Sequence, residues 1–313
     1  MLYFIKKFIN TFITILLVSI ITFYIFNILP GDPAQVILGL DASQEQIAQL
    51  RETMDLDSPA VVRYINWIES LLKGELGVSY KYQKPVAPII FDALVVTLQL
   101  SIYSLLLTLI IAIPFGLLLV SKRNKKSYIP LSIFSQIGMS IPTFCLGIFL
   151  IAIFTVNLGV LPSIGYVSFS TNPILNIKSL LLPSLSIAIG ASSIVVRYLN
   201  TSVNQQLKMD YVRTAYSLGL SEKTVLYKQV LRNALIPVIT IVGLIVTDIL
   251  AGSIIIENVF SLPGIGKLIT SSITSRDLPL IQALVLYLSL IVILVNFIID
   301  ILYRFIDPRI RIK

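Results

Sequence analysis

Residues 210–238 read DYVRTAYSLGLSEKTVLYKQVLRNALIPV, a well-charged stretch between two strongly apolar runs. The stretch predicts two short helices joined by a hinge at Gly219, because a glycine just past a helix end can take the left-handed conformation. Asp210 is the expected N-cap of the first helix, and Ser221 is the expected N-cap of the second. The second helix is expected to close at Asn233, before the next apolar run begins.

The expected first helix has two different sides. Val212, Ala215, Tyr216 and Gly219 share one face at helical spacing, whereas Arg213 points elsewhere. A small helix with an apolar face and basic flanks, held between two membrane spans, is suited to docking a soluble partner. The alternative is an amphipathic loop that lies on the membrane surface.

The composition is that of a polytopic membrane protein, with 56% hydrophobic residues, 13% charged residues and a net charge of +8. The single cysteine, Cys145, excludes a disulfide within the chain. The chain has no histidine, which excludes Ser–His and Cys–His catalysis and every His-ligated metal site. It also has no G-x-x-x-x-G-K-[ST] loop for ATP. We therefore expect no cofactor, no metal site and no ATP binding by a P-loop in this chain.

An unbroken apolar run extends from Phe8 to Leu29, and Lys6 and Lys7 precede it. A helix needs about 20 such residues to cross the hydrocarbon core of a bilayer. A secretory signal would have a shorter core and a small-residue cleavage site, so this run predicts an uncleaved first span. Five further apolar runs bring the expected total to six transmembrane helices. They cover residues 95–120, 131–156, 180–199, 235–256 and 280–303.

The Lys and Arg residues are distributed unevenly between the two sides of this arrangement. Sixteen of them fall at the two termini and in the second and fourth connections, and eight fall on the other side. Loops rich in Lys and Arg remain in the cytoplasm. Both termini and residues 210–238 are therefore expected in the cytoplasm, and the chain is expected in the cell membrane as a multi-pass protein.

One large external segment, residues 31–94, is expected between an N-terminal span in residues 1–30 and a five-helix core in residues 95–313. Within it, a helix is expected to start at Asp41 or Ser43 and to run to about Met54, and Ser43 with Gln46 fits a capping box.

A second external helix is expected to start at Ser58-Pro59, with the proline at the first helical position, and to end at Gly74. Its buried stripe is expected to consist of Val61, Tyr64, Ile65, Ile68, Leu71 and Leu72.

Two acidic residues fall inside the expected spans. Asp248 lies near the middle of the fifth span, where an ionisable group usually faces a cavity or a partner. It is expected either to line a translocation path or to make a buried hydrogen bond between helices. Asp300 lies four residues before Arg304, a spacing that favours an ion pair at the membrane interface. Further polar candidates for the path are Gln136, Ser140 and Tyr103.

Several separated motifs resemble the permease subunits of ABC importers in the dipeptide, oligopeptide and nickel family. The fixed glycine of that family's EAA loop corresponds to Gly219, and LSEKTVLYKQVLRNALIPV matches its usual continuation. The other motifs, in order, are LPGDPA from Leu29, SP-x4-Y-x2-W from Ser58, GELG-x-S from Gly74, VFSLPGIG from Val259, RDLPLIQA from Arg276 and DPRIR from Asp307.

The resemblance implies an all-α type I importer permease fold and a set of partners. These are a second homologous permease, two cytoplasmic P-loop ATPases, an external solute-binding protein and membrane lipid, with no nucleic acid. It implies that the connection at residues 200–234 couples to the ATPase. The coupling residues would be Arg213, Thr214, Ala215, Tyr216, Gly219 and Leu220. The external gate or binding-protein face would include Glu257, Phe260, Pro263 and Gly264.

The chain departs from the family pattern just before the glycine. The family commonly has Arg-Ala-Lys there, and this chain has Tyr216, Ser217 and Leu218. An apolar contact would therefore replace an ionic one in the docking surface.

The resemblance implies import of short peptides, with nickel or another metal chelate as the alternative substrate. An intramembrane aspartyl protease is a second class of function, but neither Asp248 nor Asp300 lies in a G-x-G-D sequence. A self-contained channel or scaffold is a third class, and it leaves the EAA-like loop unexplained.

Overall fold

The computed structural model describes residues 2–28, 33–39, 42–53, 55–123 and 125–306. Within these ranges the regular structure is helical, apart from one isolated antiparallel bridge between Val78 and Pro85. The chain forms two compact units, Met1–Val95 with Gly264–Leu294, and Val96–Pro263 with Val295–Lys313. Unit 1 thus combines the N-terminal residues with a segment from late in the chain, and the expected division at 30 and 94 stays a prediction.

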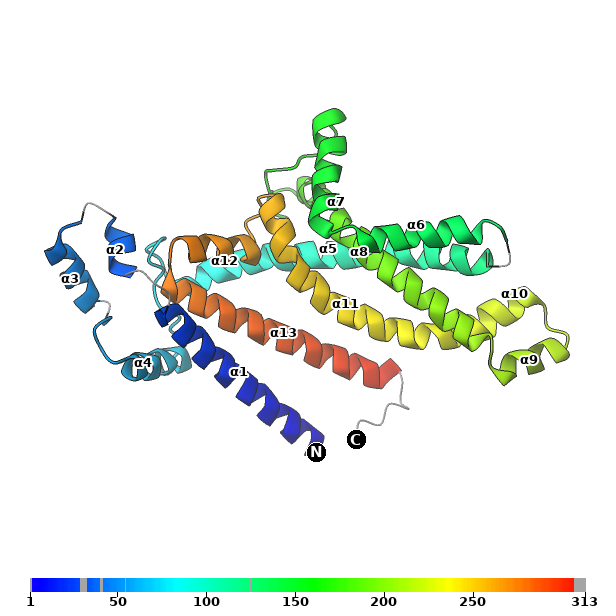
Figure 1. Ribbon diagram of the computed structural model, residues 1–313, viewed down its shortest axis with the longest axis horizontal. Coiled ribbons are helices and arrows are strands. Elements are labelled where there is room, and N and C mark those ends of the chain that lie inside the picture. The colour runs from blue at the N-terminus through cyan, green and yellow to red at the C-terminus, as the bar shows by residue number, and fades with distance from the viewer. Residues whose placement is uncertain (1, 29–32, 40–41, 54, 124, 307–313) are drawn as a thin grey trace. The chain divides into compact units, whose positions relative to one another are not determined.

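Unit 1 contains four helices of the N-terminal region, the first turns of α5, helix α12 and much of α13 (Figure 1). The bounds are α1 (Leu2–Ile28), α2 (Pro33–Leu38), α3 (Gln44–Thr53), α4 (Ala60–Leu72), α5 (Val86–Ser121), α12 (Ile265–Thr274) and α13 (Leu278–Ile306). The described core of this unit consists of Val86, Ile90, Ala93, Ile265, Leu280, Ala283 and Leu284. Residues of α5 thus pack against residues that lie 172 to 198 positions later in the chain.

The expected capping box at the start of α3 is confirmed. The Ser43 amide donates to Gln46 Oε1 at 3.0 Å, and the Gln46 amide donates to Ser43 Oγ at 3.3 Å. These two bonds satisfy backbone donors that the first helical turn leaves without an intrahelical partner.

The expected buried stripe of α4 is wrong. Val61 is 58% exposed and Leu72 is 85% exposed, and no residue of α4 is fully buried. The helix contacts α1 through Tyr64, whose hydroxyl lies 2.8 Å from Ser19 Oγ and whose ring lies 5.3 Å from that of Phe23. The contact with α1 covers only one strip of α4, so Val61 and Leu72 stay uncovered.

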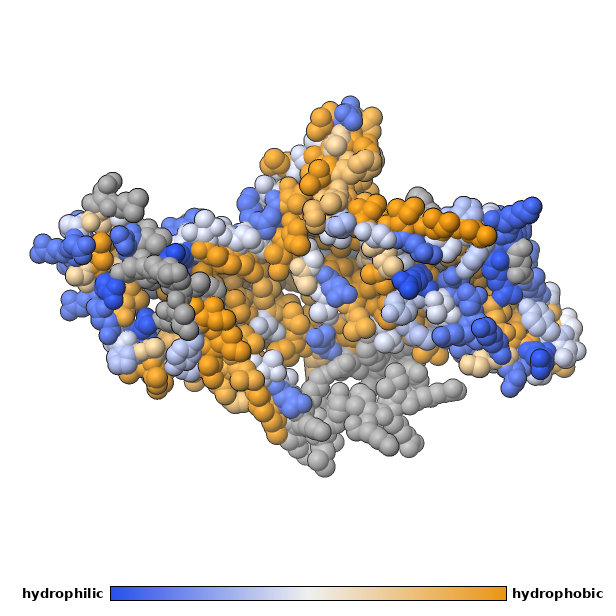
Figure 2. All heavy atoms as spheres, in the orientation of Figure 1, coloured by the Kyte–Doolittle hydropathy of each residue, from blue (hydrophilic) through white to orange (hydrophobic). Residues whose placement is uncertain are grey.

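Unit 2 is built around α8, in which 72% of the most apolar window is buried. Its other elements surround this helix or connect to it (Figure 1). The bounds are α6 (Tyr128–Ser140), α7 (Thr143–Leu150), η1 (Ile151–Asn157), α8 (Pro173–Gln206), α9 (Asp210–Ser217), α10 (Glu222–Thr224), η2 (Val225–Val230) and α11 (Leu231–Val259). Figure 2 shows hydrophobic residues over α6 and α7 and hydrophilic residues gathered around α9 and α10.

Four helices in the described residues are long and apolar enough to cross a membrane. They are Val86–Ser121, Pro173–Gln206, Glu222–Val259 and Leu278–Ile299. The pair formed by α6 and α7–η1 would be a fifth span, and α1 contributes the shorter apolar stretch Ile9–Ile25. The chain is therefore a multi-pass membrane protein, and its helices occur where the six spans were expected.

The expected span at residues 131–156 is not one continuous helix. The helix stops at Ser140 and starts again at Thr143, and the two parts are bent by 99° (Figure 1). Pro142 explains the break, because its ring disfavours helical geometry at Ile141 and it has no N–H to donate. Ile141 accordingly has an extended conformation with a ψ of 125°.

Candidate functional site

The α9 segment ends as the sequence predicts. Gly219 has a φ of +79°, its amide donates to the Tyr216 carbonyl at 3.0 Å, and the Leu220 amide donates to the Ala215 carbonyl at 3.3 Å. These two bonds form a Schellman motif, which closes a helix with a left-handed residue. Asp210 is not the N-cap, because Met209 has that place without a side-chain bond. Asp210 is instead the first helical residue, where its negative charge interacts favourably with the positive end of the helix dipole.

The second helix of the segment starts as expected but does not end at Asn233. The Thr224 amide donates to Ser221 Oγ at 3.4 Å, which makes Ser221 the N-cap. The helix then continues through the wider turns of η2 into α11, and Pro237 lies inside it. Arg232 and Asn233 do not stop a helix that is packed on its neighbours, so tertiary packing overrides the local signals.

The two sides of α9 have different environments. Val212 and Ala215 are buried and belong to the same core as Val225, Leu226 and Val230. Tyr216 and Gly219 were expected to share one face with Val212 and Ala215, but both are exposed, so the structure divides that face. The inner face of α9 therefore consists of small and branched side chains that pack on its own chain.

The outer side of α9 and its C-terminal turn carry an exposed, mainly apolar surface. Leu218 is 76% exposed, and Tyr216 and Leu220 are also exposed. Arg213 and Thr214 are exposed beside them. Of the six predicted coupling residues, Ala215 is thus buried and the other five are accessible. We call Arg213, Tyr216, Leu218 and Leu220 the α9 knob.

Two contacts fix the base of this segment to the rest of unit 2. Ser202 Oγ on α8 donates to the Ala234 carbonyl on α11 at 2.9 Å, in a buried position. Arg123, after α5, lies 3.6 Å from the Glu222 carboxylate at the start of α10. The α9 knob is therefore carried by two long helices that are joined directly to each other.

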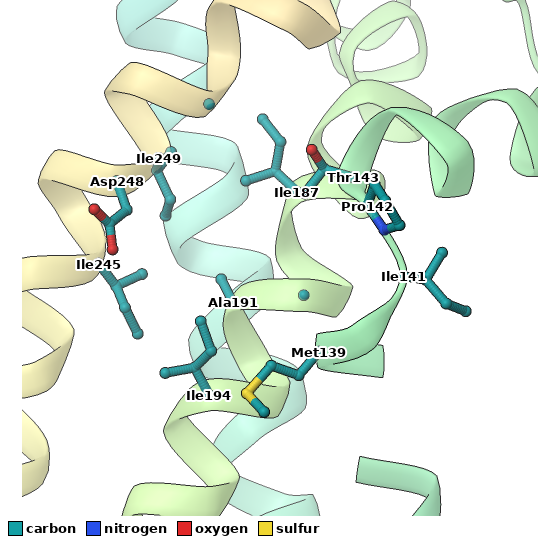
Figure 3. Close-up of a pocket in the computed structure, with 12 residues that line it drawn as sticks. Met139, Ile141, Pro142, Thr143, Ile187, Ala191, Ile194, Ile245, Asp248 and Ile249 are labelled. Atoms are coloured by element: carbon teal, nitrogen blue, oxygen red, sulfur yellow. The ribbon is translucent and has the colours of Figure 1, made fainter. Parts of the chain in front are cut away.

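A cavity of about 260 Å³ lies where the α6–α7 break faces α8 and α11 (Figure 3). Ile141, Pro142 and Thr143 of the break line one side of it. Figure 3 shows Ile187, Ala191 and Ile194 of α8 and Ile245, Asp248 and Ile249 of α11 around the rest. The cavity thus lies directly beside the break at Pro142.

The four predicted path residues do not lie together. Asp248 lines the cavity at one edge and is exposed to it (Figure 3). Gln136 and Ser140 lie on α6, outside the cavity lining, and Ser140 Oγ donates to the Gln136 carbonyl at 3.0 Å. Tyr103 lies on α5 in a different polar cluster. A path role for these residues stays a prediction, and Asp248 is the one that the geometry places in a cavity.

The polar cluster around Tyr103 has Asn176 at its centre. The Tyr103 hydroxyl donates to Asn176 Oδ1 at 3.0 Å, and Asn176 Nδ2 donates to Gln99 Oε1 at 3.1 Å and to the Val167 carbonyl at 2.7 Å. Tyr166 also donates to Gln99 Oε1 at 3.0 Å. The cluster joins the connection before α8 to α5 and α8, which gives Tyr103 a structural role.

Glu257 and Phe260, which were expected at the external gate or binding-protein face, are fully buried. Thr97 Oγ1 donates to Glu257 Oε1 at 2.6 Å, and a Cβ placed on Gly147 would lie 3.1 Å from the Phe260 ring. Both side chains are enclosed by this chain, so neither offers a surface to another protein in this conformation. Pro263 is exposed, and the adjacent Gly264 is buried. A gate role for these four residues stays a prediction.

Asp277 is the centre of a second buried polar site, which the sequence patterns did not predict. It is 0% exposed and accepts hydrogen bonds from Ser79 Oγ at 2.5 Å, the Tyr80 amide at 3.0 Å and the Lys81 amide at 3.1 Å. The Leu280 amide of α13 also donates to it at 3.4 Å. The available signal was an Asp directly before a helix that starts with Leu-Pro, which is the pattern of an N-cap.

Asp277 also changes the chemistry of Tyr80. Burial, together with the nearby Asp277 carboxylate, raises the pKa of the Tyr80 hydroxyl to about 12, and Arg63 opposes the shift. The residues from Ser79 to Lys81 are thus held against the start of α13 by backbone and side-chain bonds.

These features are those of a multi-pass membrane protein, with several apolar helices and a compact helical knob between two of them. Residues 112–312 match the protein family described as binding-protein-dependent transport system inner membrane component. Residues 1–101 match the N-terminal family of the same membrane components. The chain belongs to this family of ABC importer permeases.

Relatives and solved structures agree with this assignment. A putative peptide transport system permease protein of Brucella abortus (strain 2308) is 36% identical over 296 residues, which is 95% of this chain and 94% of the relative. The glutathione transport system permease protein GsiC of Salmonella choleraesuis (strain SC-B67) is 37% identical over 311 residues, which is 99% of each chain.

The fold is shared with a chain of the MetNI methionine ABC transporter in an inward-facing conformation. The TM-score is 0.58 at 18% identity, over 70% of this chain and 96% of that one. A crystal structure of an amino acid ABC transporter with histidines gives a TM-score of 0.56 at 15% identity, over 70% of this chain and 94% of that one. The expected all-α importer permease fold is confirmed, and the chain is a permease subunit rather than an enzyme.

Proposed function

We propose that this permease imports short peptides, which an external solute-binding protein delivers and which ATP hydrolysis on partner subunits drives across the membrane. The peptide class is supported by two relatives that match nearly the whole chain, one named for peptides and one for glutathione. Glutathione is itself a short peptide. No feature of the described residues favours the nickel alternative over peptides.

The complete transporter would contain this chain, a second homologous permease, two P-loop ATPases and the binding protein. The positive charge at the chain ends and around residues 210–238 supports a cytoplasmic location for both termini and for α9. The ATPases would then meet the α9 knob, and the binding protein would meet the opposite side of the membrane.

The observation that carries the coupling proposal is the combination of a buried inner face and an exposed apolar outer face on α9. When a partner covers an exposed group such as Leu218, the free energy of the complex falls by about 25 cal/mol for each Å² of apolar surface buried. Arg213 adds a charge beside this contact. Because Ser202 joins α8 to α11 at the base of the segment, a displacement of α9 by the ATPase would move both helices together.

The test is co-purification of the ATPase with this chain in detergent, after co-expression with its neighbouring genes. We would compare the wild type with Leu218→Glu, Arg213→Glu and Gly219→Pro. Leu218→Glu and Arg213→Glu change the exposed surface of the α9 knob. Gly219→Pro disrupts the end of α9, because the proline ring fixes φ near about −65° and residue 219 has a φ of +79°.

The matched control is Val160→Asp, which places a charge on another exposed apolar residue in a different connection of the same unit. The proposal expects the control to retain the ATPase and the three α9 variants to lose it, while all four insert into the membrane. Equal recovery of the ATPase with the α9 variants and the control would show that α9 is not the docking element.

A further inference from the structure

Asp248 has an unusual position for an acidic residue. It lies on α11, inside the helix Glu222–Val259, which is long and apolar enough to span a membrane, and it is an exposed residue in the lining of the cavity at the α6–α7 break. Every other residue that lines this cavity is uncharged. Figure 3 shows the carboxylate at one edge, with isoleucines of α8 and α11 nearby.

The carboxylate makes no hydrogen bond or ion pair with the residues that the structure describes. Its neighbour in sequence, Thr247, instead donates to Asn296 Oδ1 at 3.1 Å. A charged group at membrane depth is costly unless water or a cation compensates it. The cavity thus presents one negative charge in an otherwise apolar setting.

We propose that Asp248 binds the positively charged amino group of a peptide while the peptide passes through the cavity. This inference rests on the proposed function, and it specifies which end of the substrate the site holds. An ammonium group needs a single carboxylate partner, and the isoleucines can cover an adjacent apolar side chain of the peptide.

A bare metal ion fits this site less well than an ammonium group. Hard divalent cations take about six oxygen ligands, and softer ones take three or more nitrogen or sulfur ligands. Within the described ranges, no group of three or more His, Cys, Asp and Glu residues is placed to hold a metal ion. The volume of about 260 Å³ is slightly below that of pockets that enclose whole ligands, so the site would hold one end of a peptide.

The first test measures the charge of the cavity without requiring transport. Gly252 also lines the cavity, lies one helical turn after Asp248, and would carry a Cβ with nothing within 4 Å. A Gly252→Cys reporter in a Cys145→Ser background can react with a cationic and an anionic methanethiosulfonate reagent. The ratio of the reaction rate with the cationic reagent to that with the anionic reagent should fall about tenfold or more when Asp248→Asn is added. The Asp248 carboxylate attracts the cationic reagent and repels the anionic one when either reacts one helical turn away. An unchanged ratio would overturn the proposal.

The second test measures uptake by the assembled transporter in proteoliposomes, with a free-amino peptide and its N-acetylated form that bind the binding protein equally well. Asp248→Asn should lower uptake of the free-amino peptide about tenfold and leave the N-acetylated peptide unchanged, while Asp248→Glu should retain the preference. Thr247→Val is the matched control, because it changes the adjacent residue outside the cavity lining. An equal loss for both peptides would overturn the proposal and indicate a structural role.

The two tests separate this inference from the proposed function. If the wild-type transporter imports no peptide of either kind, the peptide assignment is wrong. The reagent ratio then decides by itself whether the Asp248 site accepts cations.

Discussion

The Ser79 hydroxyl donates a 2.5 Å hydrogen bond to Asp277, which lies 198 residues later in the chain. The same carboxylate accepts the amides of Tyr80 and Lys81, so it binds three consecutive residues of one loop. Successive backbone N–H groups of this kind form a concave site for an anion, and here the anion belongs to the protein. Two motifs that are far apart in the sequence, GELG-x-S and RDLPLIQA, are therefore parts of one structural contact.

Asp277→Ala should destabilise unit 1 strongly. The substitution removes the acceptor of four hydrogen bonds and leaves buried donors unsatisfied, at a cost of about 2–4 kcal/mol. Thermal unfolding of the purified protein in detergent should show a clear fall in the apparent Tm. The control is Asp57→Ala, which removes an exposed ion pair with Arg51 and should cost less than about 1 kcal/mol. Similar Tm values for the two variants would contradict the buried role of Asp277.

Gly219→Ala should impair coupling, whereas Gly159→Ala should not. A Cβ at either position would meet no atom within 4 Å, so crowding does not distinguish the two sites. Both glycines have a positive φ, where a Cβ costs about 1–2 kcal/mol, so the two variants differ in place and not in strain. Substrate-stimulated ATPase activity of the assembled transporter should fall for Gly219→Ala and be partly retained for Gly219→Asn. Full activity of Gly219→Ala would show that the Schellman motif is not required.

Asn176→Leu should loosen the connection before α8. It removes the acceptor of the Tyr103 hydroxyl and the donor to Gln99 and to the Val167 carbonyl, at a cost of about 2–3 kcal/mol. Faster hydrogen exchange in residues 158–172 would report this loss. Asn204→Leu is the control, because Asn204 is exposed and its bond to Asn200 is long at 3.4 Å. Unchanged exchange in Asn176→Leu would mean that the cluster does not hold the connection.

Tyr80 should remain protonated at pH values where a tyrosine in water ionises. Its folded pKa of about 12 exceeds the usual value of about 10, so the folded state binds this proton more tightly. The resulting stabilisation is present below pH 10 and is lost as the pH rises from about 10 to about 12. Ultraviolet titrations of the wild type and Tyr80→Phe should coincide to about pH 11 and diverge above it. Divergence near pH 10 would contradict the raised pKa.

Local signals predicted the helix ends well where a small number of neighbouring residues decides the geometry. The Schellman motif at Gly219, the N-cap at Ser221 and the capping box at Ser43 all follow from side-chain chemistry within one turn. The membrane character and the positions of the helices follow from long apolar runs.

Features that depend on distant packing were not predictable in the same way. The sequence contains Pro142, but whether a proline kinks a membrane helix or breaks it by 99° depends on what fills the gap. The exposure of Val61 follows from how many helices contact α4, and the burial of Asp277 follows from its approach to Ser79. Neither is visible in a local pattern.

The lengths of α8 and of the continuous helix Glu222–Val259 exceed the thickness of a membrane core. With 34 and 38 residues, these helices are about 51 and 57 Å long, whereas the hydrocarbon core of a bilayer is about 30 Å thick. About 20 Å or more of each helix therefore lies outside the hydrocarbon core. In the proposed coupling role, an ATPase would meet the α9 knob at the ends of helices that extend beyond the lipid chains.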